Sequence, residues 1–400
     1  MVGRRAPNRP LPHRRILCWG WIMDVPFNKP YMTGKELFYI ADAHFNGQLA
    51  GDGPYTRRSH QWIEEQSMCQ KALLTHSCTA ALEMAALLLN LEPGDEVIMP
   101  SYTFVSTANA FALRKAVPVF VDIRLDTLNI DEQKIEAAIT EKTKAIVPVH
   151  YAGVGCEMDT IMSSAERLGI KVVEDAAQGV LSSYKGRALG SIGHLGAYSF
   201  HETKNIISGE GGALLINHPD LCERGEIIRE KGTDRSRFFR GQVDKYTWQE
   251  IGSSFLPGEL TSAFLWAQLE EAREITEARL QIWGTYHRLI EGLEREGYLR
   301  RPIIPDECEH NAHMYYVVLS DGIDRSRVLG ELRSAGVGAV FHYIPLHSSP
   351  GGTRYGRSKD DLEISTFVSE QLIRLPFWVG MTLEEQMFVV DELGKALRQE

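Results

Sequence analysis

The chain has 400 residues, of which 44% are hydrophobic and 24% charged, as in an ordinary soluble globular protein with room for two domains. Its formal net charge of −10 argues against a nucleic-acid binder, which normally carries a basic stripe, but allows a nucleotide ligand held by a few local cations. The six cysteines are scattered without a C-x-x-C pair, which disfavours a metal site or a disulfide framework and favours a cytoplasmic protein. No apolar run approaches the roughly 20 residues of a membrane span.

Residues 1–22 have an unusual composition, because five arginines precede the apolar run 16–22. A targeting peptide is one explanation, although the run is short and no small-residue cleavage site follows it. We favour a second explanation, in which Met23 is the natural start and the preceding residues are no part of the fold. The fold is therefore sought in residues 23–400.

From about residue 68 onward, short apolar runs alternate with helical stretches. Apolar strands separated by helices are typical of a mainly parallel sheet that is covered on both faces. Such sheets bind ligands beyond the carboxyl ends of their strands, so the residues just after each strand are candidates for a site. Strands are predicted at 72–75, 96–99, 117–122, 145–149, 171–174, 197–200 and 212–216, and helices at 79–90, 106–114 and after 131.

After about residue 258 the pattern changes. One long helix is predicted over 259–295, followed by a smaller α+β portion with strands at 314–319 and 338–342 and a final helix from Leu383. Because the predicted helix is longer than the helices of the repeating strand–helix units before it, we place a domain boundary inside it, near residue 270. The prediction is an α/β protein with a large domain over 23–270 and a small C-terminal domain over 271–400.

Two strand ends carry residues suited to binding a cofactor. Cys78 and Thr79 follow the first strand at the start of a helix, where free N–H groups and the positive end of the helix dipole form an anion site. Phe104 follows the next strand and places an aromatic ring at the mouth of the sheet. Taken alone, a plain helix cap and ordinary core packing are the simpler explanations.

Asp175 and Lys204 point to a more specific chemistry. Asp175 ends an apolar strand, where a buried carboxylate is costly unless it is paired, and it can hold a protonated ring nitrogen there. Pyridoxal 5′-phosphate (PLP) needs such a partner, since its protonated pyridine ring is an electron sink. Lys204 follows a strand that ends near Ser199, and a lysine desolvated there becomes nucleophilic. With Ser199 as a further phosphate ligand, the ordered set forms a complete PLP site.

Three motifs carry a resemblance to a known family: V-V-E-D-A-A-Q at 172–178, S-F-H-E-T-K-N at 199–205 followed by G-E-G-G, and H-Y-I-P-L-H at 342–347. From about Val25 to its C-terminus the chain resembles the DegT/DnrJ/EryC1/StrS sugar aminotransferases. The resemblance implies a PLP-dependent transferase with the aspartate-aminotransferase (type I) fold. It also implies a homodimer or a dimer of dimers, with active sites shared between subunits.

Carried over position by position, the resemblance assigns roles to the residues of the site. Lys204 forms a Schiff base with PLP and shuttles a proton, and Asp175 pairs with the pyridine nitrogen. Gln178 reaches the region of the ring hydroxyl, and Phe104 stacks on the ring. The cofactor phosphate is assigned to Cys78, Thr79 and Ser199.

One segment departs from the family pattern. Many members have G-Y-N-Y-R-M, whose Asn contacts the PLP phosphate of the partner subunit, whereas this chain has G-S-S-F-L-P at 252–257. Either Ser254 replaces that Asn or the contact between subunits is made differently.

Two runs, 100–110 and 238–248, resemble the subgroup of this family that makes dTDP-4-amino-4,6-dideoxygalactose for enterobacterial common antigen. That resemblance implies L-glutamate as the amino donor and dTDP-4-dehydro-6-deoxy-D-glucose as the keto sugar. Lys245 and Tyr246 lie in the second run and are expected to bind the nucleotide sugar, although a solvated loop explains its composition equally well. His342 and His347 are assigned to the substrate side, where the family's small domain closes.

Three alternatives remain open at this stage. The chain could aminate a different nucleotide-linked keto sugar. A PMP-dependent sugar dehydratase would share the fold, but such relatives carry His where this chain has Lys204. A catalytically idle PLP-fold protein acting as a regulator or binding module would be expected to lose Asp175 or Lys204, and both are present.

Overall fold

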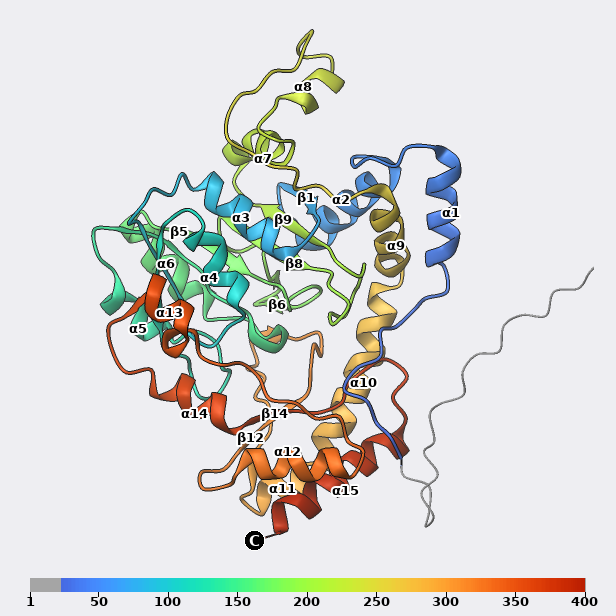
Figure 1. Ribbon diagram of the computed structural model, residues 1–400, viewed down its shortest axis with the longest axis vertical. Coiled ribbons are helices and arrows are strands. Elements are labelled where there is room, and N and C mark those ends of the chain that lie inside the picture. Colours follow the sequence, from blue (N-terminus) through green and yellow to red (C-terminus); the bar gives the residue numbers. More distant parts are fainter. Residues whose placement is uncertain (1–22, 400) are drawn as a thin grey trace, which may run out of the picture.

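The computed structural model describes residues 23–399, so the extra segment 1–22 and the expectation that Met23 is the natural start lie outside the described residues. Its centre is an eight-stranded sheet in which β9 runs antiparallel to both of its neighbours and all the other pairings are parallel (Figure 1). The predicted fold class, a large and mainly parallel sheet with a smaller C-terminal portion, is confirmed. In spatial order the strands are β1 (Lys71–Thr75), β9 (Gly212–Ile216), β8 (Leu195–Ser199), β5 (Lys171–Asp175), β4 (Thr143–Ile146), β2 (Glu96–Pro100), β3 (Val117–Val121) and β13 (Arg357–Ser358).

Helices cover both faces of this sheet, which explains why its strands are apolar along their whole length. Successive side chains of a strand point to opposite faces, and in β5 Val172 packs into one hydrophobic core and Val173 into the other. One core includes residues of α2 (Pro54–Ser67), α5 (Glu132–Ala138), α6 (Met158–Leu168) and α9 (Glu259–Glu270), and the other residues of α3 (Cys78–Leu88), α4 (Val105–Ala112) and α7 (Cys222–Arg229).

The C-terminal portion has a hydrophobic core of its own, seen in the lower half of Figure 1. A three-stranded antiparallel sheet, β10 (Leu299–Arg300), β12 (Tyr316–Leu319) and β14 (Leu372–Arg374), packs with α12 (Arg325–Ser334) and α15 (Leu383–Arg398). Val25, near the start of the described chain, is fully buried in this second core and bridges to Val337. Within residues 23–399, no helix is long and apolar enough to cross a bilayer.

The prediction of a single long helix over 259–295 is wrong. The segment forms three helices, α9, α10 (Ala272–Leu289) and α11 (Glu291–Arg295), and the first break lies at Glu271, whose backbone angles of φ −111° and ψ 16° are not helical. Before and just after the break, Leu269 and Ile275 pack under the large sheet, whereas Tyr286 packs in the second core. Residues on both sides of the break thus share one core, and α10 itself extends from that core into the second one.

The prediction of a strand at 338–342 is also wrong. Only an isolated bridge between Val340 and Arg374 forms there. The Ala339 N–H donates to Val337 O at 3.0 Å, which turns the chain locally and interrupts any ladder. Gly338 is pressed so closely against the N-terminal segment that a Cβ atom would lie 2.6 Å from Phe27 N.

Gly212 illustrates how tightly the sheet and its helices meet at the site. It pairs with Thr75 on one side and with Ser199 on the other, where β1, β9 and β8 adjoin the start of α3. A Cβ atom at this position would lie 2.4 Å from Cys78 N and 2.5 Å from Ser77 C. Only glycine therefore allows the first turn of α3 to approach the sheet this closely.

We expect Gly212→Ala to lower the free energy of unfolding by about 1–3 kcal/mol, because overpacking against a backbone cannot be relieved by a rotamer change. Denaturant unfolding followed by circular dichroism measures this loss. The control is Gly330→Ala in α12, where a new Cβ meets nothing within 4 Å and should stabilise the helix by up to about 1 kcal/mol. Equal stability of the two variants would contradict the close approach.

Candidate active site

One cavity of about 560 Å³ lies at the carboxyl ends of the strands, where the two portions of the chain meet. Its walls come from the starts of α3 and α4, the ends of β5 and β8, and the segments around His313, His342 and Arg374. Eight of the twelve predicted site residues line it, namely Cys78, Thr79, Phe104, Asp175, Gln178, Ser199, Lys204 and His342.

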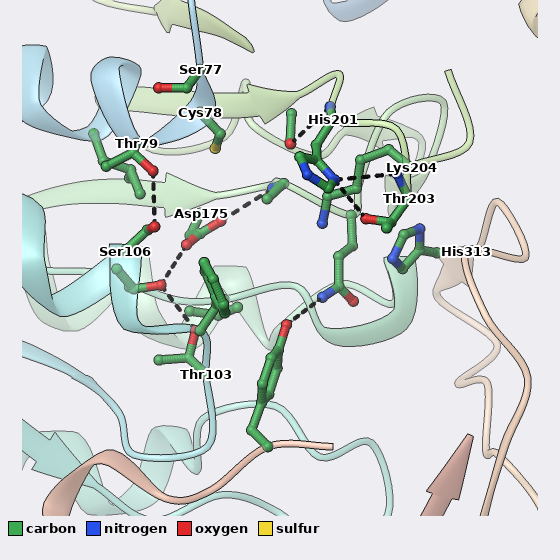
Figure 2. Close-up of a pocket in the computed structure, with 18 of the residues that line it drawn as sticks. Ser77, Cys78, Thr79, Thr103, Ser106, Asp175, His201, Thr203, Lys204 and His313 are labelled. Atoms are coloured by element: carbon green, nitrogen blue, oxygen red, sulfur yellow. Dashed lines mark hydrogen bonds between the residues drawn. The ribbon is translucent and has the colours of Figure 1, made fainter. Parts of the chain in front are cut away.

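The start of α3 forms one end of the cavity. Ser77 caps the helix, and its hydroxyl accepts a hydrogen bond from the Ala80 N–H at 3.1 Å. The N–H groups of Cys78 and Thr79 belong to the first turn and have no acceptor within the helix. The Thr79 hydroxyl donates to Ser106 Oγ at 2.8 Å and so joins the starts of α3 and α4 (Figure 2). This arrangement of free amides and hydroxyls suits an anion such as phosphate.

Asp175 lines the cavity and is 5% exposed. Its carboxylate accepts a hydrogen bond from the Thr107 hydroxyl at 2.7 Å, and the Thr103 and Thr107 hydroxyls lie 2.9 Å apart (Figure 2). The Ala177 N–H donates to its other oxygen at 3.2 Å. These bonds keep the acid in one orientation without neutralising it, so it can pair with a cationic ligand atom.

Glu174, the neighbouring acid, points to the opposite side of β5. It is fully buried, lies 2.9 Å from His150 Nε2, and accepts hydrogen bonds from the N–H groups of Gly190, Ile192 and Gly193. Since its partners are all supplied by the protein, Glu174 anchors the strand. The two adjacent acids therefore differ in role, because a strand alternates the faces of its side chains.

Lys204 reaches the cavity from the loop between β8 and β9. Its backbone N–H donates to His201 O at 2.9 Å, and its side chain forms no ion pair within residues 23–399. Burial lowers the pKa of the Lys204 amine, and the charge of Arg374 lowers it further, while Cys78 and Asp175 act in the opposite direction. A desolvated amine with a lowered pKa is a nucleophile for a carbonyl group.

Phe104 and Gln178 complete the wall opposite the sheet. Phe104 is 55% exposed although it lines the cavity, so one face of its ring is free to stack on a flat ligand. Gln178 accepts a hydrogen bond from the Ala152 N–H at 2.6 Å and donates to the Tyr343 hydroxyl at 3.2 Å. Its amide is thereby fixed at the edge of the cavity.

Four predicted residues do not line the cavity of a single chain. His347 lies outside it and its Nδ1 is 2.7 Å from Ser101 Oγ. Ser254 bridges to Glu230 and is exposed. Lys245 and Tyr246 are exposed in the segment after α8 (Arg235–Phe239), which projects at the top of Figure 1, far from the C-terminal portion.

The structure also brings in residues that the sequence analysis did not single out: Thr103, Thr107, His313, Tyr343 and Arg374. Thr107 had a usable signal, since it lies one helical turn after Thr103 in the run that follows a strand end. Arg374 ends β14, almost 200 residues from Asp175 in the chain, and no local pattern marks it. Only the packing of the C-terminal portion on the sheet places it here.

These residues fit pyridoxal phosphate. The free amides of α3 suit its phosphate, Asp175 its protonated ring nitrogen, Lys204 its aldehyde, and Phe104 the face of its ring. Figure 2 shows Asp175, Lys204 and the residues at the start of α3 around the same cavity. The donor set thus matches all the functional groups of one molecule.

We expect Thr107→Val to weaken PLP binding about tenfold or more, since a hydrogen bond to a charged group contributes roughly 1.5–3 kcal/mol. Titration of the apoprotein with PLP, followed by visible absorbance, measures the change. The control is Thr285→Val, which removes a surface hydroxyl bonded to Gln281 O and should leave PLP affinity unchanged. Equal affinities of the two variants would show that Thr107 does not help to hold Asp175.

The pKa of Lys204 predicts how the apoprotein reloads with PLP. Only the free amine attacks the aldehyde, and burial lowers the pKa of Lys204 from its ordinary value of 10.5. The rate of reloading should therefore rise with pH and level off below pH 10.5. Stopped-flow absorbance across a pH series gives the profile, and a rate still rising at pH 10.5 would contradict a lowered pKa.

Comparison with known proteins agrees with this geometry. Residues 30–394 match the model of the DegT/DnrJ/EryC1/StrS aminotransferase family. An uncharacterized protein of Methanocaldococcus jannaschii is 34% identical, over 94% of this chain and 97% of its own. The GDP-perosamine synthase of Caulobacter vibrioides is 31% identical, over 92% and 97%. The spore coat polysaccharide biosynthesis protein SpsC of Bacillus subtilis is 31% identical, over 94% and 96%.

Solved structures agree with these sequence matches. The PLP form of the putative sugar aminotransferase Spr1654 from Streptococcus pneumoniae has a TM-score of 0.86 at 25% identity, covering 94% of this chain and 99% of that one. DesV of S. venezuelae, solved with a ketimine intermediate, has a TM-score of 0.85 at 26% identity, with the same coverage. Together with the lysine, the aspartate and the anion site of the cavity, these matches show that the chain belongs to the DegT/DnrJ/EryC1/StrS aminotransferase family and is a PLP-dependent sugar aminotransferase.

Proposed function

We propose that the protein transfers the amino group of L-glutamate to dTDP-4-dehydro-6-deoxy-D-glucose, giving dTDP-4-amino-4,6-dideoxy-D-galactose and 2-oxoglutarate. The observation that carries the reaction class is the buried Lys204 amine facing the same cavity as Asp175. The likeness of runs 100–110 and 238–248 to the corresponding subgroup supports the choice of sugar, and the first of these runs supplies Phe104 and Thr107 to the cavity wall. The product of this reaction would then serve a surface polysaccharide such as enterobacterial common antigen.

The residues of the chain divide the work as follows. PLP, when bound, supplies an electron sink that makes the α-proton of an amino acid acidic. Asp175 keeps the ring nitrogen protonated, and the amides of Cys78 and Thr79, with Ser199, hold the phosphate. Lys204 Nζ accepts the α-proton of the donor and later delivers a proton on one face of the sugar. A positioned acid–base group of this kind contributes about 10²–10⁴-fold to the rate.

We further propose that the enzyme works as a homodimer, or a dimer of dimers, in the cytoplasm. Ser254, Lys245 and Tyr246 are exposed and lie away from the cavity of their own chain, which supports a role in the cavity of a partner subunit. Exposed apolar side chains flank them, with Trp248 77% and Ile251 60% accessible, as expected of a surface that another subunit covers. The division into domains at 23–270 and 271–400, with His342 and His347 on the substrate side, is part of the same proposal.

A GDP-linked 4-keto sugar is a second candidate substrate. The named GDP-perosamine synthase of Caulobacter vibrioides is 31% identical over 92% of this chain, which is as similar as any other named relative above. The two candidates differ in the nucleotide. The nucleotide therefore distinguishes them experimentally.

A panel assay tests the substrate. Purified protein loaded with PLP is incubated with L-glutamate and, separately, with dTDP-, UDP- and GDP-linked 4-keto-6-deoxy sugars, and 2-oxoglutarate is measured. We expect kcat/KM to be highest for the dTDP sugar, and proton NMR of the product to show an axial amine at C4. A preference for the GDP sugar, or an equatorial amine, would overturn this choice of substrate while leaving the reaction class intact.

We expect Lys204→Ala to lose turnover by several orders of magnitude, because both the covalent attachment and the proton shuttle depend on this amine. The visible absorption band of lysine-bound PLP, which borohydride abolishes in the native protein, should be missing. Lys395→Ala, which removes an exposed lysine paired with Glu392 on α15, is the matched control and should retain both band and turnover. Full turnover by the Lys204 variant would refute the mechanism and favour an idle cofactor-fold protein.

A further inference from the structure

His313 reaches the cavity from the C-terminal portion and has one ring nitrogen without a partner. The residue lies shortly before β12, is 5% exposed, and lines the cavity with Lys204 (Figure 2). The same two residues also line a smaller hollow of about 10 Å³. Its Nδ1 lies 2.9 Å from Asn205 Oδ1, whereas no hydrogen bond forms at its Nε2 within residues 23–399. Buried polar atoms are normally paired, so a ligand atom is expected at Nε2.

The contacts of Asn205 determine which nitrogen of His313 carries the proton. The Asn205 Nδ2 group donates to Asn311 O at 2.8 Å, and a backbone carbonyl can only accept. This bond fixes the orientation of the amide, so the amide oxygen faces His313, and it too can only accept. The Nδ1 atom of His313 is therefore the donor. In the neutral ring, Nε2 then has no proton and presents a lone pair to the cavity.

The environment of His313 keeps the ring neutral. Burial lowers the pKa of His313 well below its ordinary value of 6.5, and the charges of Lys204 and Arg374 lower it further. A protonated ring would add another cation beside these two. At neutral pH the side chain therefore acts as a hydrogen-bond acceptor, in a part of the cavity where the neighbouring groups are donors.

The backbone around His313 is held in a strained conformation. Ala312 has a φ of 50°, in the left-handed region that a residue with a Cβ atom rarely adopts. The buried Arg279 donates to Ala312 O at 3.1 Å and to His313 O at 2.7 Å. Strain of this kind persists only where surrounding contacts enforce it, and it is concentrated at functional sites. A buried arginine thus holds the turn that directs this ring to the cavity.

An unprotonated nitrogen at this position selects for a ligand group that donates. Carboxylates of an amino acid and phosphates of the cofactor or a nucleotide only accept hydrogen bonds, so none of them suits Nε2. The hydroxyls of a sugar can donate. In a 4-keto-6-deoxy sugar, the ring carbon on one side of the carbonyl bears a methyl group, and C3, on the other side, bears a hydroxyl. The C3 hydroxyl is thus the only donor next to the carbon that must reach Lys204.

We propose that His313 Nε2 accepts a hydrogen bond from the C3 hydroxyl of the keto sugar and thereby makes that hydroxyl a requirement for tight binding. The inference rests on the proposed transamination of a 4-keto-6-deoxy sugar. It makes His313 a specificity-determining residue of the C-terminal portion. A buried acceptor that loses its donor is left unpaired, which lowers affinity on the order of 10- to 100-fold.

Calorimetry with unreactive ligands tests the contact directly. PLP-loaded protein is titrated with dTDP-6-deoxy-D-galactose, which has a hydroxyl in place of the keto group, and with the same compound lacking the C3 hydroxyl. We expect the native protein to bind the deoxy compound on the order of 10- to 100-fold more weakly. For His313→Asn we expect the two affinities to be equal, because nothing in this variant accepts a hydrogen bond at the position of Nε2.

Two variants separate the two nitrogens of the ring. The amide nitrogen of His313→Asn can occupy the position of Nδ1 and still donate to Asn205. In His313→Gln the longer side chain can place its amide oxygen near the position of Nε2 and gives up the contact with Asn205. We therefore expect His313→Gln to retain most of the preference for the C3 hydroxyl. The opposite order, with the preference lost in His313→Gln and kept in His313→Asn, would leave His313 only a structural tie to Asn205 and overturn the inference.

His287→Gln is the matched control. His287 belongs to the same C-terminal portion, is half-buried, and has a pKa lowered by burial, but it lies outside the cavity lining. It should leave both affinities unchanged. L-glutamate should bleach the visible band of His313→Asn at the same concentration as in the native protein, which shows that the site has folded. A comparable loss of glutamate affinity in that variant would place the acceptor at Lys204 or the amino acid and overturn the inference.

The nucleotide separates this inference from the proposed function. The same pair of sugars linked to GDP is titrated in parallel. If only the GDP-linked pair binds, and His313→Asn abolishes its preference for the C3 hydroxyl, the proposed substrate fails and the contact stands. Equal binding of the hydroxyl and deoxy compounds by the native protein, with the nucleotide that it accepts, overturns the inference whichever substrate is correct. Failure of every nucleotide sugar to bind would overturn both.

Discussion

The carboxylate of Asp175 at the end of β5 is the constraint on which the rest of the site depends. A charged group at the buried end of an apolar strand is tolerated only when hydrogen bonds hold it, and Thr107 at 2.7 Å together with the Ala177 N–H does so. Thr107 can reach Asp175 only because α4 begins beside the end of β5. The strand itself is anchored through Glu174, which accepts three backbone hydrogen bonds and faces His150.

Electrostatically the cavity has two unlike ends. At the start of α3 and around Asp175, amides, hydroxyls and one carboxylate are arranged for a phosphate and a protonated ring. At the other end, Lys204 and Arg374 both line the cavity, and neither forms an ion pair among residues 23–399. Such a pair of cations keeps the amine of Lys204 reactive and leaves Arg374 available to an anion.

Several features were readable from local sequence because they follow from short-range rules. The alternation of apolar strands and helices predicted the mainly parallel sheet, and strand ends predicted the cavity residues from Cys78 to Lys204, all within one sheet edge. Two secondary-structure predictions failed where tertiary packing overrides local preference. At Glu271 the backbone leaves the helical region although residues on both sides pack in one core, and at Gly338 the N-terminal segment presses on the backbone and limits the pairing to one bridge.

The sequence by itself thus determined the fold class, the cofactor and the anchoring lysine, because each depends on residues that directly follow strands and so gather at one edge of the sheet. Only the tertiary structure decided which of the adjacent acids faces the cofactor, since a strand alternates the faces of its side chains. It also decided that Lys245 and Tyr246 lie away from the cavity of their own chain. Finally, it brought Arg374 into the same cavity as Lys204, because the C-terminal portion packs against the large sheet.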